Sequence, residues 1–337
     1  TDKTLSENYS RKWDLQTAPQ VCSGCSVGCN ISPGERYGKV KRIQNRYHSE
    51  INGYFICDRG RFSHDSAARE DRPRQALGAP IPPLNTVKGV VGIGSPRASL
   101  EANFALRELV GAGNFYAGVS AHDAALNNAV RDVLRNGKAH IATVSDIENS
   151  DCVVILGEDL TNTAPRLALA VRQAARGEHM NQAHSVKILD WQDAAIRTHS
   201  QGIKRSPVFV LTANETKLDD IASAYRVTPD AAARITGAIV HAMTHTLDHS
   251  APDVALQAAL SSAEQAIAAT LLAAVQRAKK PLIISGTHSG SLALVQAAAS
   301  LSAALTTEQH AQTLVLTLPE ANSLGLALMD APPLDAA

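Results

Sequence analysis

The sequence of 337 residues predicts an α/β protein in which a small polar domain precedes parallel sheets covered by helices. From residue 87 onward, short apolar runs alternate with Ala- and Leu-rich helical patterns. Hydrophobic residues make up 45% of the chain and aromatic residues only 4%, so the apolar content is mostly aliphatic, as in buried parallel strands. The first 75 residues are polar and charged, and they hold four of the five cysteines.

Charge and hydropathy exclude several classes of protein. Lys and Arg number 32 and Asp and Glu number 32, so the chain lacks the basic surface of a nucleic-acid binder. No run approaches the roughly 20 apolar residues of a membrane helix, so we expect no direct membrane insertion. There is no signal-peptide pattern, and the first residue is Thr1 rather than Met. We therefore expect an internal fragment or a processed product.

Turn and linker signals mark the N-terminal part. The tripeptide Ser32-Pro33-Gly34 predicts a turn there. Pro and Gly then crowd residues 78–84, where they prevent a helix and favour extended chain. The sequence therefore places a linker between the polar domain and the α/β part.

The apolar runs and helical patterns define the expected elements. Strands are expected at 89–93, 151–156, 186–189, 207–211, 281–284 and 313–316. Helices are expected at 99–109, 165–175, 229–243, 262–278 and 291–305. The first helix has Ser99 as its cap, with Leu100, Phe104 and Leu109 along one side, and the span 214–280 shows no strand. Alternation of this kind is typical of a doubly wound sheet.

Four cysteines have the spacing of an iron–sulfur site. Cys22, Cys25 and Cys29 form a C-x2-C-x3-C pattern, and Cys57 follows at a distance. Gly24 and Gly28 lie between the first three, where a tight wrap needs residues that tolerate positive φ. Three close ligands and one remote ligand commonly hold a [4Fe–4S] cluster, whereas structural zinc favours two separated pairs. We expect the four cysteines to bind one [4Fe–4S] cluster, with zinc as the alternative.

Two further residues, Arg59 and Cys152, are assigned roles from their places in the sequence. A cubane with four thiolates is an anion, and its burial requires cations or hydrogen-bond donors nearby. Arg59, two residues after Cys57, is the flanking cation that we single out for this role. Cys152 begins an apolar run and is expected to be a buried core residue.

Glycine turns and a histidine series are weaker candidates. The turns at 92–99 and 285–291 could offer amide groups to a phosphate, but neither forms G-x-G-x-x-G, and Arg97 stands at the third position. His241, His245 and His249 share a helical face, without the carboxylate of an H-E-x-x-H site. We interpret the turns as ordinary parts of an α/β sheet and the histidines as a solvent-facing stripe.

Several motifs carry a family resemblance. They include Ser10-Arg-Lys-Trp-Asp, the four cysteines, Cys57-Asp-Arg-Gly-Arg, Leu156-Gly-Glu-Asp and Lys280-Pro-Leu-Ile-Ile-Ser-Gly-Thr. Along nearly its whole length the chain resembles the large iron–sulfur subunit of bacterial respiratory complex I, the NADH:quinone oxidoreductase. That family is similar to the molybdopterin oxidoreductases.

The resemblance implies a domain plan. A [4Fe–4S] cluster domain would occupy 1–75, and two doubly wound α/β domains of molybdopterin-oxidoreductase type would follow. The first of these would be discontinuous, at 76–145 and 279–337, and the second would be inserted at 146–278. The chain would be an internal fragment that has lost a loop after Gln75.

The resemblance also implies a function. The chain would be an electron-transfer and scaffold subunit that contacts other peripheral-arm subunits of complex I on the cytoplasmic side of the inner membrane. Arg59 stands where catalytic relatives have Lys, no molybdenum ligand is recognisable, and Leu189-Asp-Trp-Gln lacks an Asp-Pro-Arg motif. We therefore expect a vestigial molybdopterin site, no molybdenum or pterin, and no catalytic residue in this chain. The alternatives are an active formate dehydrogenase-like molybdopterin protein and a zinc-stabilised interaction module.

Overall fold

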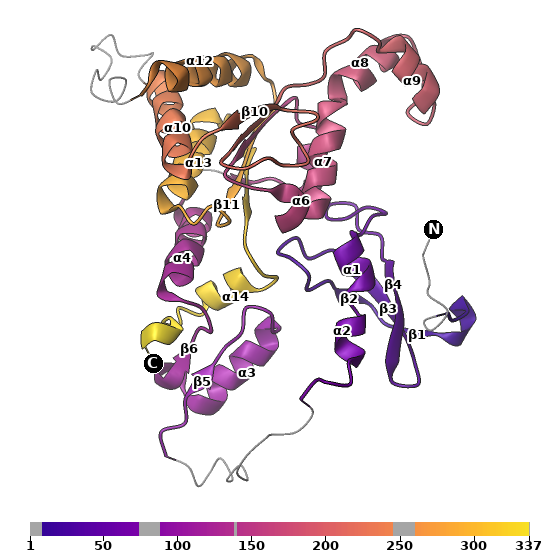
Figure 1. Ribbon diagram of the computed structural model, residues 1–337, viewed down its shortest axis with the longest axis vertical. Helices are drawn as coiled ribbons and strands as arrows, with labels where there is room; N and C mark the ends of the chain where they lie inside the picture. The colour runs from indigo at the N-terminus through magenta and orange to yellow at the C-terminus, as the bar shows by residue number, and fades with distance from the viewer. Residues whose placement is uncertain (1–8, 74–87, 138–139, 245–259, 337) are drawn as a thin grey trace. The chain divides into compact units, whose positions relative to one another are not determined.

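A computed structural model describes residues 9–73, 88–137, 140–244 and 260–336 (Figure 1). The chain divides into unit 1, which comprises Thr1–Ala124 and Glu320–Ala337, and unit 2, which comprises Ala125–Pro319. The expected linker at 78–84 and the expected domain end at residue 75 fall outside the described residues.

The N-terminal segment, defined as residues 9–73, is a four-stranded antiparallel sheet followed by two short helices. The central strand β3 pairs with the other three strands. The elements, after a 3-10 turn at Lys12–Asp14, are β1 (Gln16–Thr17), β2 (Gln20–Val21), β3 (Asn30–Arg36), β4 (Lys39–Asn45), α1 (Asp58–Phe62) and α2 (Asp65–Ala68).

The turn predicted at Ser32-Pro33-Gly34 is wrong, because these residues lie inside β3. A Cβ on Gly34 would come within 2.9 Å of Leu15 Cδ1, so packing of Leu15 explains this glycine. The chain reverses instead at Tyr37 and Gly38, whose φ angles are 54° and 77°. Two residues of positive φ are the geometry that a tight hairpin between twisted strands requires.

The rest of unit 1 is a short parallel strand–helix–strand arrangement. Ser99 caps its helix as expected, since its Oγ accepts from Ala102 N at 3.1 Å. Leu100, Phe104 and Leu109, however, are exposed. The elements are β5 (Gly92–Ile93), α3 (Leu100–Val110), a 3-10 turn at Ala112–Asn114, β6 (Phe115–Tyr116), α14 (Ser323–Leu328) and a 3-10 turn at Leu334–Ala336.

Unit 2 contains a six-stranded sheet in the order β10-β9-β8-β11-β12-β7, with every neighbouring pair parallel. The predictions at 151–156, 207–211, 281–284 and 313–316 are confirmed, because aliphatic runs mark strands buried on both faces. The strands are β7 (His140–Ile141), β8 (Cys152–Leu156), β9 (Val208–Thr212), β10 (Ser223–Arg226), β11 (Pro281–Gly286) and β12 (Gln312–Thr317).

Helices cover both faces of this sheet: α10, α12 and α13 lie on one side and α7 on the other (Figure 1). The core under the first group includes Leu156, Leu211, Ile235, Leu271 and Leu301. No helix in the described ranges is long and apolar enough to cross a bilayer. The helices are α4 (Ala121–Asn136), α5 (Val144–Glu148), α6 (Leu160–Thr163), α7 (Pro165–Ala175), α8 (Gly177–Ser185), α9 (Asp193–His199), α10 (Pro229–Thr244), α12 (Ser262–Arg277) and α13 (Leu292–Leu305).

Two strand expectations are wrong. Residues 186–189 form no strand: they follow α8 in an exposed turn in which Lys187 has a φ of 63°. The span 214–280 does contain a strand, β10. This edge strand pairs only with β9, and its residues are half-buried or exposed, so it carries no apolar run that a sequence pattern could show.

The α/β class with parallel sheets is confirmed, but the observed division of the α/β part differs from the expected one. The expected plan places β8 and β9 in an inserted domain at 146–278, and β11 and β12 in a discontinuous domain. All four share one sheet, because β8 and β11 pair along four residues. Alternation of apolar runs reveals that strands exist but not which of them become neighbours.

Candidate metal centre

The four predicted ligands lie in two loops of the N-terminal segment. Cys22, Cys25 and Cys29 belong to the loop that joins β2 to β3, and Cys57 immediately precedes α1. Cys25 and Cys29 are 7% exposed, while Cys22 and Cys57 are half-buried. None of the four is in a disulfide, so all four thiols are available as ligands.

The antiparallel pairing of β2 and β3 closes the first loop at its base. Val21 pairs with Asn30, and Cys22 N donates to Cys29 O at 2.8 Å, so the first and third cysteines lie side by side. Gly28 has the expected positive φ of 67°. Gly24 does not have a positive φ, and a Cβ there would make ordinary van der Waals contact with Cys22 Sγ at 3.4 Å.

The second loop brings Cys57 to the first. A Cβ on Gly60 would lie 3.3 Å from Cys22 Sγ and 3.9 Å from Cys57 Sγ, so both sulfurs flank this buried glycine. Backbone amides point at the same sulfurs: Gly24 N donates to Cys22 Sγ and Gly60 N to Cys57 Sγ, both at 3.4 Å. Such N–H groups stabilise the negative charge of a thiolate ligand.

The thiols also influence one another electrostatically. Burial raises the pKa of Cys22 and Cys25, and the neighbouring Cys57 raises both further. Backbone N–H groups and the Arg59 guanidinium act in the opposite direction. A raised pKa leaves these cysteines as neutral thiols at pH 7, so a bound metal is needed to hold them as thiolates.

Arg59 lies beside the cysteines, as expected from its place in the sequence. Its Nη1 donates to Gly24 O at 3.2 Å, and its Cδ would lie 3.4 Å from a Cβ on Gly24. It therefore contacts the backbone between Cys22 and Cys25 and places a positive charge where a cluster would bring negative charge.

Sequence reasoning missed Asn52, which is fully buried. Its Oδ1 accepts from Asn30 N at 2.9 Å, and its Nδ2 donates to Arg46 O at 3.1 Å. These bonds tie the loop that leads to Cys57 to the residue that follows Cys29. The dipeptide Asn52-Gly53 indicates a turn, but nothing in the sequence shows which backbone groups the amide reaches.

A zinc ion and a cubane cluster differ in how far apart they hold four thiolates. Thiolates on one zinc ion lie within about 4 Å of each other, because each Zn–S bond is about 2.3 Å. A cubane gives each thiolate its own iron and holds the sulfurs further apart. Among the described residues, no three His, Cys, Asp or Glu side chains are close enough to hold a single ion. The four thiols, the two amide donors and Arg59 are the groups that the site offers to either kind of centre.

The other candidates do not join this site. Cys152 is fully buried in the unit 2 core, and burial raises its pKa to about 12, which confirms the expectation of a core residue. His241 lies on α10, while His245 and His249 fall outside the described residues.

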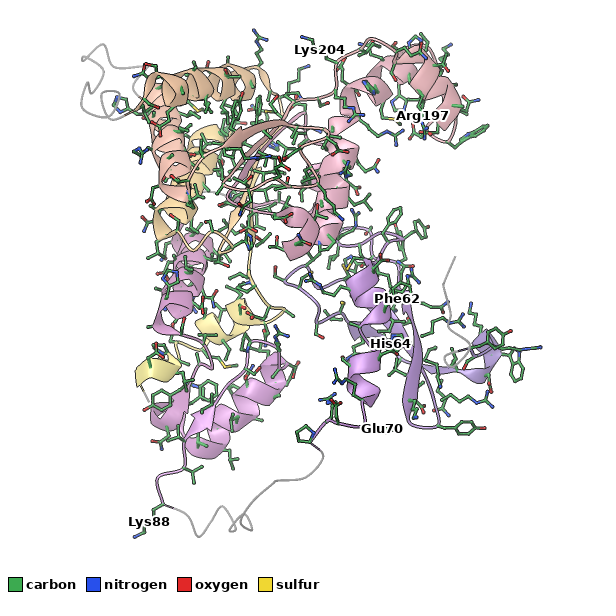
Figure 2. All side chains as sticks on the ribbon, viewed as in Figure 1. Phe62, His64, Glu70, Lys88, Arg197 and Lys204 are labelled. Carbon is green, nitrogen blue, oxygen red and sulfur yellow. The ribbon has the colours of Figure 1, made fainter. Side chains whose placement is uncertain are left out.

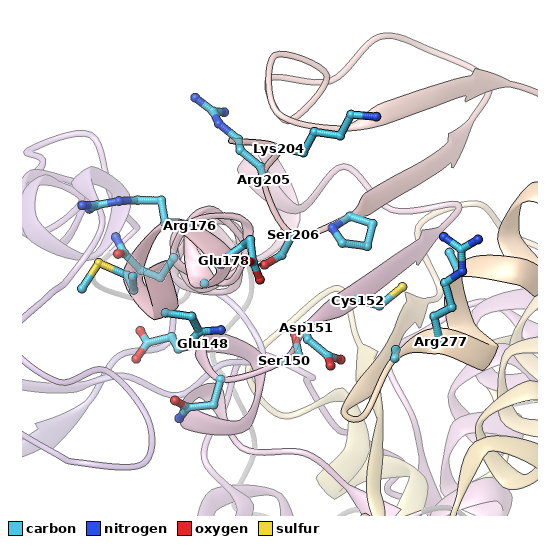
Figure 3. Close-up of a pocket in the computed structure, with 18 of the residues that line it drawn as sticks. Glu148, Ser150, Asp151, Cys152, Arg176, Glu178, Lys204, Arg205, Ser206 and Arg277 are labelled. Atoms are coloured by element: carbon cyan, nitrogen blue, oxygen red, sulfur yellow. Dashed lines mark hydrogen bonds between the residues drawn. The ribbon is translucent and has the colours of Figure 1, made fainter. Parts of the chain in front are cut away.

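A cavity of about 920 Å³ lies at the amino edge of the unit 2 sheet. Figure 3 shows Cys152 within it and the charged side chains around it. Its carboxylates are engaged in structural bonds: Glu148 contacts Arg166 at 2.7 Å, and Asp151 accepts from the backbone N–H groups of Lys279 and Lys280 at 2.8 Å. The first contact joins α5 to α7, and the second joins the start of β8 to the residues that precede β11, so both carboxylates have structural roles.

Comparison with known proteins extends these observations. Residues 15–69 match the molybdopterin oxidoreductase Fe4S4 domain family. The chain is 47% identical over 351 residues to the G subunit of NADH-quinone oxidoreductase from Pseudomonas fluorescens, and 45% identical over 351 residues to that of Escherichia coli strain K12. The alignments cover 100% and 98% of this chain but 38% and 37% of those relatives, so the chain spans well under half of their length.

One solved structure also overlaps with the chain. The formyltransferase/hydrolase complex from Methylorubrum extorquens, determined with methylofuran, gives a TM-score of 0.36 at 11% identity, over 67% of this chain and 53% of that one.

Proposed function

The chain is homologous along its whole length to part of the G subunit of NADH-quinone oxidoreductase, and from this premise we propose that it is the cluster-binding and scaffold section of such a protein. The observation that supports this most directly is local. The Fe4S4 domain match covers the two loops in which Cys22, Cys25, Cys29 and Cys57 lie, and Cys22 and Cys57 flank Gly60 there.

A bound [4Fe–4S] cluster would supply one-electron chemistry at this site. The four cysteines would hold it, and the amides of Gly24 and Gly60 would donate to ligand sulfurs. Arg59 would add positive charge beside Cys22 and Cys25. These donors and this cation favour the reduced, more negative state, so the segment sets the potential rather than performing substrate chemistry.

The rest of the chain has a supporting role in this proposal. We place no molybdenum or pterin in it, and we regard its α/β part as a scaffold derived from the molybdopterin-oxidoreductase plan. We also propose contacts with other peripheral-arm subunits of complex I, at the cytoplasmic side of the inner membrane and without insertion. The names of the relatives support the assembly.

Metal analysis tests the proposal. The protein is purified anaerobically, and iron, sulfide, zinc and molybdenum are quantified alongside EPR after reduction. We expect about four irons and four sulfides per chain, with a reduced-cluster EPR signal. A colourless protein with one zinc would establish the interaction module, and stoichiometric molybdenum would establish the formate dehydrogenase-like alternative.

Cysteine variants locate the site. Cys25→Ser removes a buried ligand, so we expect loss of most of the iron. Cys152→Ala is the matched control, because its thiol is also buried but lies in the unit 2 core. Iron retained in Cys25→Ser, or lost in Cys152→Ala, would contradict the assignment.

A further inference from the structure

The strand order of unit 2 creates a switch point between β8 and β11. From β8 the sheet extends through β9 to β10 on one side, and through β11 to β12 on the other. In open α/β sheets, the crevice at the carboxyl ends of two such strands is where ligands bind. Here Glu158 follows the end of β8 by two residues, and His288 follows the end of β11 by two residues.

The Glu158 carboxylate is buried at this point, with 1% of the residue exposed. Its Oε1 accepts from His288 N at 3.0 Å, and its Oε2 accepts from Thr163 Oγ1 at 3.1 Å. The hydroxyl of Thr317, the last residue of β12, donates to Ser285 O on β11 at 3.4 Å. Donors from the segments that follow β8 and β11 therefore converge on one carboxylate, as they would on a bound anion.

The carboxylate also fits closely against the sheet. A Cβ on Gly286, the last residue of β11, would lie 2.6 Å from Glu158 Oε1 and 2.2 Å from Thr317 Oγ1. Only a glycine leaves room for the carboxylate there. The turn that follows Gly286 is one of the two that the sequence marked as able to offer amides to an anion, and its His288 amide donates to Glu158.

We propose that this switch point is a carboxylate-binding site which the chain fills with its own side chain, Glu158. The filled site joins the carboxyl ends of β8 and β11. Shortening Glu158 to Ala removes the CH2–COO⁻ fragment, and free acetate supplies the same fragment with one additional hydrogen. The emptied site therefore takes acetate. The inference extends the scaffold role proposed above, and its test depends on neither the cluster nor a partner.

The test compares two Glu→Ala variants of the full chain. Glu158→Ala is unfolded thermally in acetate and in chloride of equal ionic strength. We expect a lowered midpoint in chloride, and an increase of about 3 °C or more in acetate well above its Kd. Acetamide, which has the same shape but no charge, should raise the midpoint of Glu158→Ala by less than acetate does.

Glu264→Ala is the matched control. The Glu264 carboxylate accepts from Ser261 N at 2.8 Å and from Ser261 Oγ at 2.9 Å, but it caps a helix start instead of filling a pocket between strands. Acetate should not raise its midpoint above the chloride value. An equal acetate effect in both variants, or none in Glu158→Ala, overturns the proposal.

A second variant applies if Glu158→Ala does not fold even in acetate. Glu158→Gln keeps the side-chain volume but replaces a charged acceptor with a weaker neutral one. Hydrogen exchange at the His288 amide should then be at least about tenfold faster than in the parent protein, with the Ser261 amide unchanged. Equal protection at His288 overturns the proposal. Iron content is measured in every variant, so this result is separate from the test of the cluster.

Discussion

Arg59 is a single cation whose side chain crosses the first cysteine loop. Its hydrogen bond to Gly24 O holds the guanidinium beside Cys22 and Cys25, where its charge partly opposes the rise in the pKa of both thiols that burial causes. A positive charge that favours thiolate also favours the electron that reduces a cluster. The residue is exposed, so water and salt reduce its effect.

Removing this charge should shift the reduction potential of the cluster. We expect Arg59→Ala to make the potential more negative by roughly 30–60 mV, the effect of one charge a few ångströms away at an effective dielectric between protein and water. A redox titration followed by EPR measures the shift. Arg46→Ala, an exposed cation in the same segment, should leave the potential within error. Equal shifts in the two variants would show that the reduction potential responds to the net charge of the protein and not to the position of Arg59.

Two glycines illustrate how space decides the effect of one added methyl group. A Cβ on Gly286 would lie 2.4 Å from Thr317 O, which is backbone and cannot move away easily. Gly237 lies within α10, and a Cβ there would meet nothing within 4 Å. We expect Gly237→Ala to raise the free energy of unfolding by about 0.5–1 kcal/mol and Gly286→Ala to lower it by more than that. Urea titration measures both, and a gain in Gly286→Ala would contradict the packing at the end of β11.

Helix α12 shows how an element begins. Ser261 Oγ accepts from Glu264 N, and the Glu264 carboxylate accepts from Ser261 N, so each satisfies a free amide of the other. These bonds hold the pKa of Glu264 below its ordinary value. A carboxylate with a lowered pKa stabilises the fold above its unfolded pKa, and that stabilisation is lost as the pH falls through the folded pKa.

Loss of this cap should be measurable in unit 2. We expect Ser261→Ala to reduce the free energy of unfolding by about 1 kcal/mol at pH 7, and the reduction should shrink toward pH 3 as Glu264 becomes protonated. Ser262→Ala, one residue further on, is the control, because Ser262 is not the cap residue. Urea titrations at both pH values check this, and a reduction that does not depend on pH would show that Glu264 takes no part in the cap.

The elements that could be predicted from the sequence are those whose own residues form a recognisable pattern along the chain. Cys152–Leu156 and Pro281–Gly286 are buried along their whole length, so their aliphatic runs reveal the strands. Strand β10 is partly exposed and has no such run. The four cysteines are recognisable from spacing, whereas the role of Asn52 depends on backbone groups that only the fold brings together. The pairing of β8 with β11 likewise joins residues that are far apart in the chain, so no local pattern shows it.

At the scale of the whole molecule, the two parts of the chain are stabilised differently. All seven aromatic residues in the N-terminal segment are exposed, as Phe62 on α1 shows (Figure 2): Tyr9, Trp13, Tyr37, Tyr47, Tyr54, Phe55 and Phe62. The buried apolar side chains in the described part of that segment are two isoleucines and two cysteines: Ile31, Ile43, Cys25 and Cys29. A segment in which cysteines form half of the apolar core depends on what those cysteines bind. Unit 2, by contrast, has a large aliphatic core.

Removal of the cluster should therefore unfold one part of the chain and spare the other. We expect limited proteolysis of Cys25→Ser to cleave within residues 9–73 at least about tenfold faster than in the parent protein. Cleavage within unit 2 should be unchanged, because the four cysteines proposed to bind the cluster all lie in residues 9–73 and outside the unit 2 core. Mass spectrometry of the fragments locates the cuts. Equal acceleration in both parts would show that the N-terminal segment and unit 2 unfold together.

The position of β11 between β8 and β12 has a consequence for synthesis on the ribosome. Ser285 and Leu156, which are joined by a hydrogen bond across the two central strands, lie 129 residues apart in the chain. At about 5–20 residues per second, β8 emerges roughly 6–25 s before the strand that covers its second edge. During that interval an aliphatic strand with an open edge is available to pair with other nascent chains, a hazard that ends once β11 covers it.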